Sequence, residues 1–208
     1  KVETEVQFIR LLANSPLQVN VELLRLDTHR SSSNSEQHLD TFYRYFSEVK
    51  NNNYDALLIT GAPLAHLEYE EVAYWEELKV IIDWAEQHVT STLFSCWAAH
   101  AALYHRYNLK RDLKDNKLCG VFTHQCYFAH GALTRGFDDT FLVPHSRYGH
   151  IDINKINACE ELVVLAGSER VGAYLLKNKS GSQVFITGHP EYDADSLKAE
   201  YERDLQKS

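Results

Sequence analysis

Apolar and polar stretches alternate along the chain in a way that predicts short strands and helices. Apolar positions at helical spacing predict a helix over 2–13, which Asn14 to Pro16 end. The nearly all-apolar run 54–60 suits a parallel strand that is buried on both faces. Further strands are expected at 18–26, 91–95, 162–167, 172–178 and 182–188, and further helices over 41–49, 70–88, 97–107 and 194–206.

This alternation of helices with short apolar strands is typical of an α/β protein with a three-layer arrangement around a central sheet. With 208 residues, we expect a single domain over 1–208. The polar stretch 27–37 is expected to form a surface loop. The sequence contains no methionine, so we expect further residues upstream of Lys1.

Charge and cysteine content narrow the class of protein. The formal net charge is -8 and no cluster of Lys and Arg stands out, so a nucleic-acid partner is not expected. No apolar run is long enough to span a membrane, and we expect a cytoplasmic protein. The four cysteines form no C-x-x-C pair and are expected to be free thiols. No bound metal is expected, because the spacing of His124, Cys126 and His130 matches no paired zinc pattern.

Cys96 stands directly after the expected strand 91–95 and before a helix. In open α/β sheets, ligands bind at the carboxyl ends of the strands, and a helix N-terminus favours the thiolate, which is the nucleophilic form. An ordinary buried core cysteine is the alternative interpretation, because cysteine is among the most buried residue types. From this segment alone, the buried core cysteine is the favoured interpretation.

A second strand end supports the catalytic interpretation. The expected strand 182–188 leads into His189, Pro190 and Glu191, and side chains two residues apart on extended chain point to the same side. Glu191 can therefore orient His189 as a base, which together with Cys96 gives a nucleophile, base and orienting carboxylate. A solvated loop His and Glu is the alternative. Backbone N–H groups near Leu64, after the strand 54–60, and at Trp97 could hold an oxyanion, although an ordinary turn explains Leu64 equally well.

At these residues the chain resembles the homoserine O-acyltransferase family, the transsuccinylases and transacetylases of methionine biosynthesis. Segments that resemble the family cover nearly the whole chain, in the family's order: ETEVQFIRLLANSPLQV, LLITGAPL, VAYWEEL, HVTSTLFSCWAA, LTRGFDD, PHSRY and ITGHPEYDA. The resemblance implies a flavodoxin-like sheet similar to class I glutamine amidotransferases. It also implies that an N-terminal strand and a C-terminal tail of the family are absent from this chain.

The same resemblance implies a role for each matching residue. Cys96 would carry the acyl group as a thioester, with His189 as the general base and Glu191 orienting it. Lys117, Ser146 and Arg203 match substrate-binding positions, and a planar Arg203 suits an amino-acid carboxylate. Acyl-coenzyme A would be a co-substrate and a hydroxy amino acid the acceptor, with no bound cofactor. Family members are commonly dimers, so a homodimer is expected by analogy.

Three residues near this site depart from the family pattern. Ala65 occupies the position that sets the preference for the acyl donor in the family. Members with glycine there use succinyl-CoA, and members with glutamate use acetyl-CoA. Alanine would not repel a succinyl carboxylate, but it matches neither pattern. His66 and His100 also differ from relatives. The sequence therefore leaves open an acetyl or succinyl donor and L-homoserine or L-serine as acceptor. A glutamine amidotransferase and a catalytically silent binding protein of the same fold are further alternatives.

Overall fold

The computed structural model of the chain describes residues 2–28 and 36–206. Most of the polar loop expected over 27–37 lies outside these residues. None of the helices in these two ranges is long and apolar enough to cross a membrane.

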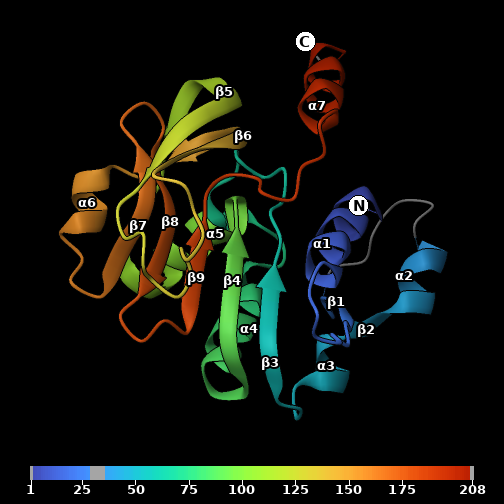
Figure 1. Cartoon of the computed structure of the whole chain (residues 1–208). Helices are drawn as coiled ribbons and strands as arrows, with labels where there is room; N and C mark the ends of the chain where they lie inside the picture. Colours follow the sequence, from blue (N-terminus) through green and yellow to red (C-terminus); the bar gives the residue numbers. More distant parts are fainter. Residues whose placement is uncertain (1, 29–35, 207–208) are drawn as a thin grey trace.

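A sheet of seven strands forms the centre of the molecule, with mixed strand directions (Figure 1). The first three strands in spatial order, β3, β4 and β9, pair in parallel, whereas β8, β7, β5 and β6 continue the sheet with antiparallel pairing. In spatial order the strands are β3 Tyr54–Ile59, β4 Val89–Ser95, β9 Gln183–Ile186, β8 Gly172–Asn178, β7 Leu162–Ser168, β5 Asp112–Cys126 and β6 Thr140–His150.

Helices and a curled hairpin cover the sheet. The main core lies where α4 (Trp75–His88) and α5 (Trp97–Tyr107) pack on the sheet, with Phe94 and Phe185 stacked at 5.2 Å between ring centroids. A second apolar cluster joins Val143 of β6 to residues of β7, β8 and β9. The β5–β6 hairpin therefore curls over the sheet and supplies part of its cover, and the predicted α/β class is confirmed.

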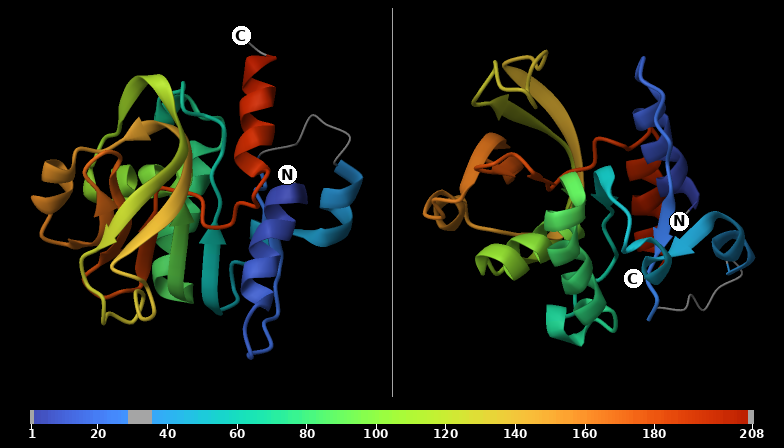
Figure 2. Two further views of the ribbon diagram at one scale, coloured as in Figure 1. Left: turned by 45° about the horizontal axis from the view of Figure 1, so that its top comes forward. Right: turned by 90° about the horizontal axis from the view of Figure 1, so that it is seen from below.

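The N-terminal part packs along the β3 edge of the sheet. Helix α1 (Val2–Ala13) lies beside the start of α7 (Ser196–Leu205), where the Gln7 amide donates to Ser196 Oγ at 2.7 Å (Figure 2). A two-stranded parallel sheet precedes β3, and a separate apolar cluster packs this region against α4. The remaining elements are β1 Leu23–Arg25, α2 Glu36–Phe42, β2 Tyr43–Tyr45, α3 Phe46–Val49, the 3-10 turn η1 Tyr69–Glu71 and α6 Ile153–Asn157.

Several sequence expectations need correction in this region. The strand expected over 18–26 shortens to β1, and the helix expected over 41–49 is interrupted by β2, whose aromatic residues suit a strand that pairs with β1. The strand β3 is parallel to β4, as expected, but it is not buried on both faces. It forms the edge of the sheet, and Asp55 and Ala56 are exposed.

The hairpin of β5 and β6 is the largest feature that the hydrophobic pattern does not predict. Much of β5 is exposed, so its apolar positions do not alternate clearly with polar ones. In β6 burial does alternate, but the buried side of that strand includes His145 and Arg147, which are polar. A search for alternating apolar residues does not detect a strand whose buried side chains include polar ones.

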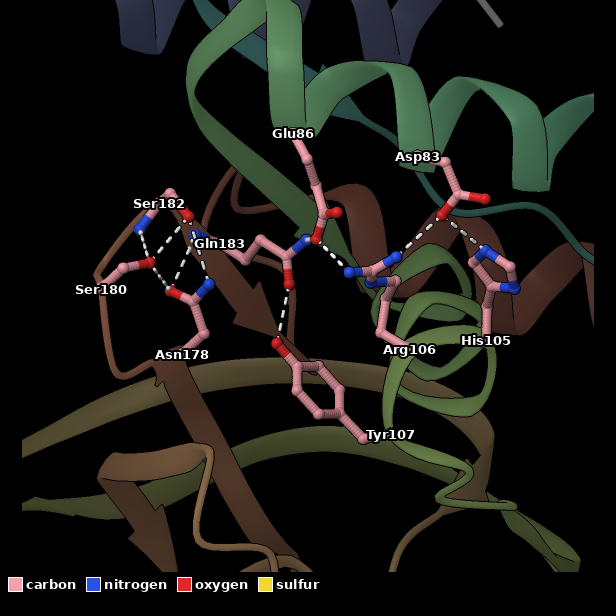
Figure 3. A network of polar contacts seen from close by, with 9 residues as sticks. All are labelled: Asp83, Glu86, His105, Arg106, Tyr107, Asn178, Ser180, Ser182 and Gln183. Atoms are coloured by element: carbon pink, nitrogen blue, oxygen red, sulfur yellow. Dashed lines mark hydrogen bonds and ion pairs between the residues drawn. The ribbon is translucent and has the colours of Figure 1, made fainter.

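A polar network fixes the C-terminal end of α5 to neighbouring elements (Figure 3). Tyr107 donates to Gln183 Oε1 at 2.8 Å, and the Gln183 amide donates to Glu86 of α4 at 3.2 Å. Arg106 pairs with Glu86 and, at 2.9 Å, with Asp83. Helix α5 is thus anchored to α4 and to the beginning of β9, which leaves its N-terminus at the carboxyl ends of the strands.

Candidate active site

Cys96 forms a sharp turn between β4 and α5. Its φ of 52° and ψ of -113° lie in a region that non-glycine residues seldom adopt, and its N–H donates to the carbonyl of Ile186 at 2.8 Å. A Cβ placed on Gly61 would lie 3.2 Å from the Cβ of Cys96, so the absence of a side chain at Gly61 lets the 61–64 turn approach closely. Cys96 as a whole residue is 8% exposed, and it stands at the start of α5.

His189 and Glu191 lie together after β9, as the sequence predicts. Their Nδ1 and Oε1 atoms are 2.8 Å apart, and both side chains are buried. Gly188 is required before them, because a Cβ there would lie 2.6 Å from Cγ1 of Val143. The His189 N–H donates to the carbonyl of Pro144, which ties this segment to β6. With Nδ1 bonded to Glu191, the other ring nitrogen of His189 is left for Cys96.

Electrostatics favour a charged pair at this site. Burial by itself would lower the pKa of His189, but a negatively charged Cys96 sulfur, a hydrogen bond to that sulfur and the Glu191 carboxylate together raise it to about 10. His189 is therefore charged at neutral pH when the Cys96 sulfur beside it carries a negative charge. Such a pair supplies a nucleophile and a proton donor at once.

The two sides of the expected oxyanion site differ in their donors. Trp97 is the first residue of α5, and its N–H has no backbone partner among the described residues. The N–H of Leu64 instead donates to the carbonyl of Ala62 at 2.9 Å. Trp97 is thus the better placed donor, while Leu64 and Ala65 line the neighbouring turn. Arg111 holds that turn through the carbonyl oxygens of residues 64, 65 and 67.

The three residues expected to bind substrate come from different elements and converge on Glu200. Ser146 of β6 donates to the Glu200 carboxylate, Lys117 of β5 lies 3.7 Å from it, and Arg203 of α7 lies 3.5 Å from it. Asp204 also pairs with Lys117 at 2.6 Å and with Arg203 at 3.1 Å.

Sequence reasoning missed Glu200, although it stands one helical turn before Arg203. The desolvation of Glu200 would raise its pKa, but hydrogen bonding from Ser146 and the charges of Lys117 and Arg203 lower it overall. The carboxylate therefore stays ionised.

Tyr192 connects this group to the catalytic histidine. Its ring stacks on His189 with centroids 4.2 Å apart, and its hydroxyl hydrogen-bonds Glu200. Burial, followed by the negative charges of Glu200 and Cys96, raises the pKa of Tyr192. The hydroxyl therefore stays protonated, and one continuous set of contacts runs from His189 to Glu200.

The two histidines that depart from the family pattern occupy different environments. His66 is exposed and its ring lies 4.8 Å from that of Tyr148. His100 is 3% exposed, one turn after Cys96 in α5, and burial followed by the charges of Arg147 and Arg111 keeps its pKa well below the usual value.

A hydrogen-bonded chain of buried side chains lies behind the site. Arg147 Nε donates to His145 Nδ1 at 3.2 Å, and His145 and His124 are joined through their Nε2 atoms at 3.1 Å. His124 Nδ1 lies 2.9 Å from the carbonyl of Phe122, so it carries a hydrogen. This order of donors keeps both histidines neutral.

Comparison with known proteins places the chain in a family. The family model described as homoserine O-succinyltransferase matches residues 1–208. A protein of Pseudoalteromonas translucida (strain TAC 125) named homoserine O-succinyltransferase is 89% identical over 208 residues, which are 100% of this chain and 66% of that protein. One of the same name from Pseudoalteromonas atlantica (strain T6c / ATCC BAA-1087) is 53% identical over 99% of this chain and 67% of its own length. The chain thus spans about two thirds of these relatives.

Solved structures of glutamine amidotransferase type share the fold. A glutamine amidotransferase from Thermotoga maritima has a TM-score of 0.59 at 16% identity, over 91% of this chain and 86% of its own. The glutaminase domain of Trypanosoma brucei CTPS with bound acivicin has a TM-score of 0.60 at 10% identity, over 92% and 78%. These similarities support the fold, and the match of the family model over the whole chain shows that it belongs to the homoserine O-succinyltransferase family.

Proposed function

We propose that the protein transfers a succinyl group from succinyl-CoA to the side-chain hydroxyl of L-homoserine, through a thioester on Cys96, in methionine biosynthesis. The observation that carries this proposal is the arrangement of Cys96, His189 and Glu191 at adjoining strand ends in a chain 89% identical to a protein of that name. Succinyl is preferred over acetyl because the matching family and relatives are named for succinyl transfer.

The first half-reaction forms the acyl-enzyme. The Cys96 thiolate attacks the thioester carbonyl carbon, and the resulting oxyanion accepts a hydrogen bond from the N–H of Trp97. As the intermediate collapses, the bond to the coenzyme A sulfur breaks and that sulfur takes the proton from the His189 imidazolium. The product is a succinyl thioester on Cys96, with His189 now neutral.

The second half-reaction reverses these roles. Neutral His189 takes the proton of the homoserine hydroxyl, whose oxygen attacks the acyl thioester. Collapse of the intermediate breaks the bond to the Cys96 sulfur and restores the thiolate beside the imidazolium. Glu191 keeps the ring in the required orientation through its contact with Nδ1.

The polar group around Glu200 suits the two charged ends of an amino acid. Arg203 can bind the carboxylate through its planar fork, and the Glu200 carboxylate can accept hydrogen bonds from the ammonium group. Arg203 is paired with Asp204 in this structure, so we infer that substrate binding replaces that ion pair. Lys117 and Ser146 keep Glu200 ionised and in place.

Intact mass measurement after incubation with succinyl-CoA alone tests the acyl-enzyme. We expect one succinyl adduct on the protein, no adduct on Cys96→Ala, and an undiminished adduct on Cys119→Ala, whose cysteine is exposed. The His189→Ala variant should form the adduct roughly 10²- to 10⁴-fold more slowly, the range for loss of a general acid–base group. An adduct that survives in Cys96→Ala would contradict the assignment.

Steady-state rates with succinyl-CoA or acetyl-CoA, combined with L-homoserine or L-serine, test the substrates. We expect the highest kcat/KM with succinyl-CoA and L-homoserine. Hydrolysis of glutamine without acyl transfer would instead support the amidotransferase alternative, whose fold is shared. The homodimer and the cytoplasmic location stay predictions.

A further inference from the structure

Arg111 is a buried cation in the loop that leads from α5 into β5. The residue as a whole is 7% exposed, and its guanidinium carbon lies 4.4 Å from the centre of the Tyr69 ring. Nη2 donates to the carbonyl oxygens of Leu67 at 2.7 Å and Ala65 at 3.2 Å, with Leu64 at 3.5 Å. These contacts fix the plane and the position of the guanidinium beside the turn that contains Ala65.

The charge of Arg111 has no carboxylate partner in the part of the chain that the structure describes. Its hydrogen bonds to carbonyl oxygens are all made by Nη2, and Nε and Nη1 make none to a carbonyl or carboxylate oxygen among those residues. A buried cation without an opposite charge is costly, because its desolvation is not offset by Coulomb attraction. Such a group is well suited to receive an anion from a ligand.

A second buried arginine provides a useful contrast. Arg147 also lacks a carboxylate partner, but Nε, Nη1 and Nη2 each donate to an acceptor: His145, Gly149 and Val171. Its guanidinium is therefore occupied by the protein on every nitrogen. Of these two arginines, Arg111 is the one with donors left for a ligand.

Arg111 is also linked to the nucleophile through neighbouring residues. A Cβ on Gly149 would be 3.2 Å from both Cδ of Arg111 and Nδ1 of His100, and His100 donates its N–H to the carbonyl of Cys96. On the other side, the turn that Arg111 holds begins at Gly61, which packs against Cys96. Arg111 is thus connected to Cys96 on two sides, through His100 and through the turn that it holds.

We propose that Arg111 binds the distal carboxylate of the acyl donor and so selects a dicarboxylic acyl group, a role that rests on the proposed acyl transfer. Nε and Nη1 would donate two parallel hydrogen bonds to that carboxylate, while Nη2 keeps the turn around Ala65 in place. An acetyl group has no carboxylate and gains nothing from this cation. A glutamate in place of Ala65 would offer its own carboxylate to the same guanidinium.

Equilibrium binding of succinyl-CoA and acetyl-CoA to the full chain carrying Cys96→Ala tests this role without requiring acyl transfer. We expect Arg111→Met to weaken succinyl-CoA binding about 10- to 100-fold, the scale of a lost charged hydrogen-bond pair, and to change acetyl-CoA binding much less. Arg111→Lys should retain part of the preference. Arg147→Met is the matched buried control and should not change the ratio of the two affinities.

Equal weakening for both donors in Arg111→Met, or no weakening, would overturn the role and leave Arg111 as a support for the turn. Ala65→Glu provides a second route that leaves Arg111 intact, which guards against failure of Arg111→Met to fold. It should weaken succinyl-CoA binding while Arg111 is present, and unchanged binding in Ala65→Glu also contradicts the proposal. Failure of acyl transfer itself appears separately, as the absence of a Cys96 adduct on the unaltered protein with either donor.

Discussion

Two neighbours, Cys96 and Glu191, raise the pKa of His189, and Cys96 has the larger effect. Burial opposes the charged ring, the negatively charged Cys96 sulfur is the first contribution that favours it, and Glu191 adds to it. The pKa of about 10 therefore depends on the thiolate more than on the carboxylate. At the residue scale, the charge of the base therefore depends on the charge of the nucleophile beside it.

Removing each neighbour in turn should lower the pKa of His189 to different extents. We expect Cys96→Ala to lower it more than Glu191→Gln, because both the charge and the hydrogen bond of the sulfur are lost. NMR titration of the ring Cε1–H signal of His189 measures the three values. An unchanged pKa in Cys96→Ala would show that no thiolate lies beside the ring.

At the scale of elements, the end of α5 opposite the nucleophile is held by side chains from β9 and α4. The hydroxyl of Tyr107 donates a hydrogen bond to Gln183 Oε1 at the beginning of β9, and Gln183 is almost fully buried. Asn108 ends the helix in a left-handed conformation, which its short polar side chain tolerates. These contacts orient the helix whose first residue, Trp97, faces the site.

Loss of the Tyr107 hydroxyl should destabilise this junction without affecting catalysis. Tyr107→Phe leaves Gln183 Oε1 buried without its donor, so we expect a loss of about 1 to 2 kcal/mol in the free energy of unfolding. Tyr104→Phe is the matched control, because its hydroxyl bonds Glu70 at an exposed position, and it should change stability by less than about 0.5 kcal/mol. Urea denaturation measures both, and an equal effect of the two substitutions would contradict the role of the junction.

Some elements could be predicted from the sequence because their local patterns agree with their tertiary setting. The helices at 2–13 and 97–107 and the strands before Cys96 and His189 are of this kind. The β5–β6 hairpin could not be predicted, because its buried positions include His124, His145 and Arg147. Polar side chains are buried at low cost only when they are hydrogen-bonded, and the bonds between these residues form only in the folded protein.

The site divides in the same way. His189 and Glu191 could be paired from their two-residue spacing, whereas Glu200 and Arg111 carry no local signal. Their importance arises from contacts with residues far away along the chain, Ser146 and the 64–67 turn respectively. The resemblance to a family identified Lys117, Ser146 and Arg203, but the acidic residue on which they converge required the structure.

At the scale of the whole molecule, buried neutral histidines make stability depend on pH. His124 and His145 are fully buried and His100 is nearly so. Burial is the largest cause that lowers the pKa of each, and the charge of Arg147 lowers them further, with the pKa of His145 reaching about 2. The folded protein therefore excludes protons that the same side chains bind in the unfolded chain near pH 6.5.

The sign of the effect follows from proton counts. Below pH 6.5 the unfolded state binds more protons at these three histidines, so stability falls as the pH decreases. The limiting slope is about 1.4 kcal/mol per pH unit for each histidine. His189 does not offset this, because its raised pKa keeps it protonated in both states below pH 6.5 and its contribution is constant there.

We therefore expect urea midpoints to fall steeply between pH 6.5 and 5.5, a range in which the contribution of His189 is nearly constant and which lies above the ordinary titration of carboxylates. His145→Gln should be less stable at pH 7.5, since it disturbs the hydrogen bonds with Arg147 and His124, yet its stability should depend less on pH. His130→Gln, at an exposed position, should keep the slope of the unaltered protein. A stability that is constant over this range would mean that the folded protein can protonate these rings, and hence that the β5–β6 hairpin opens readily around them.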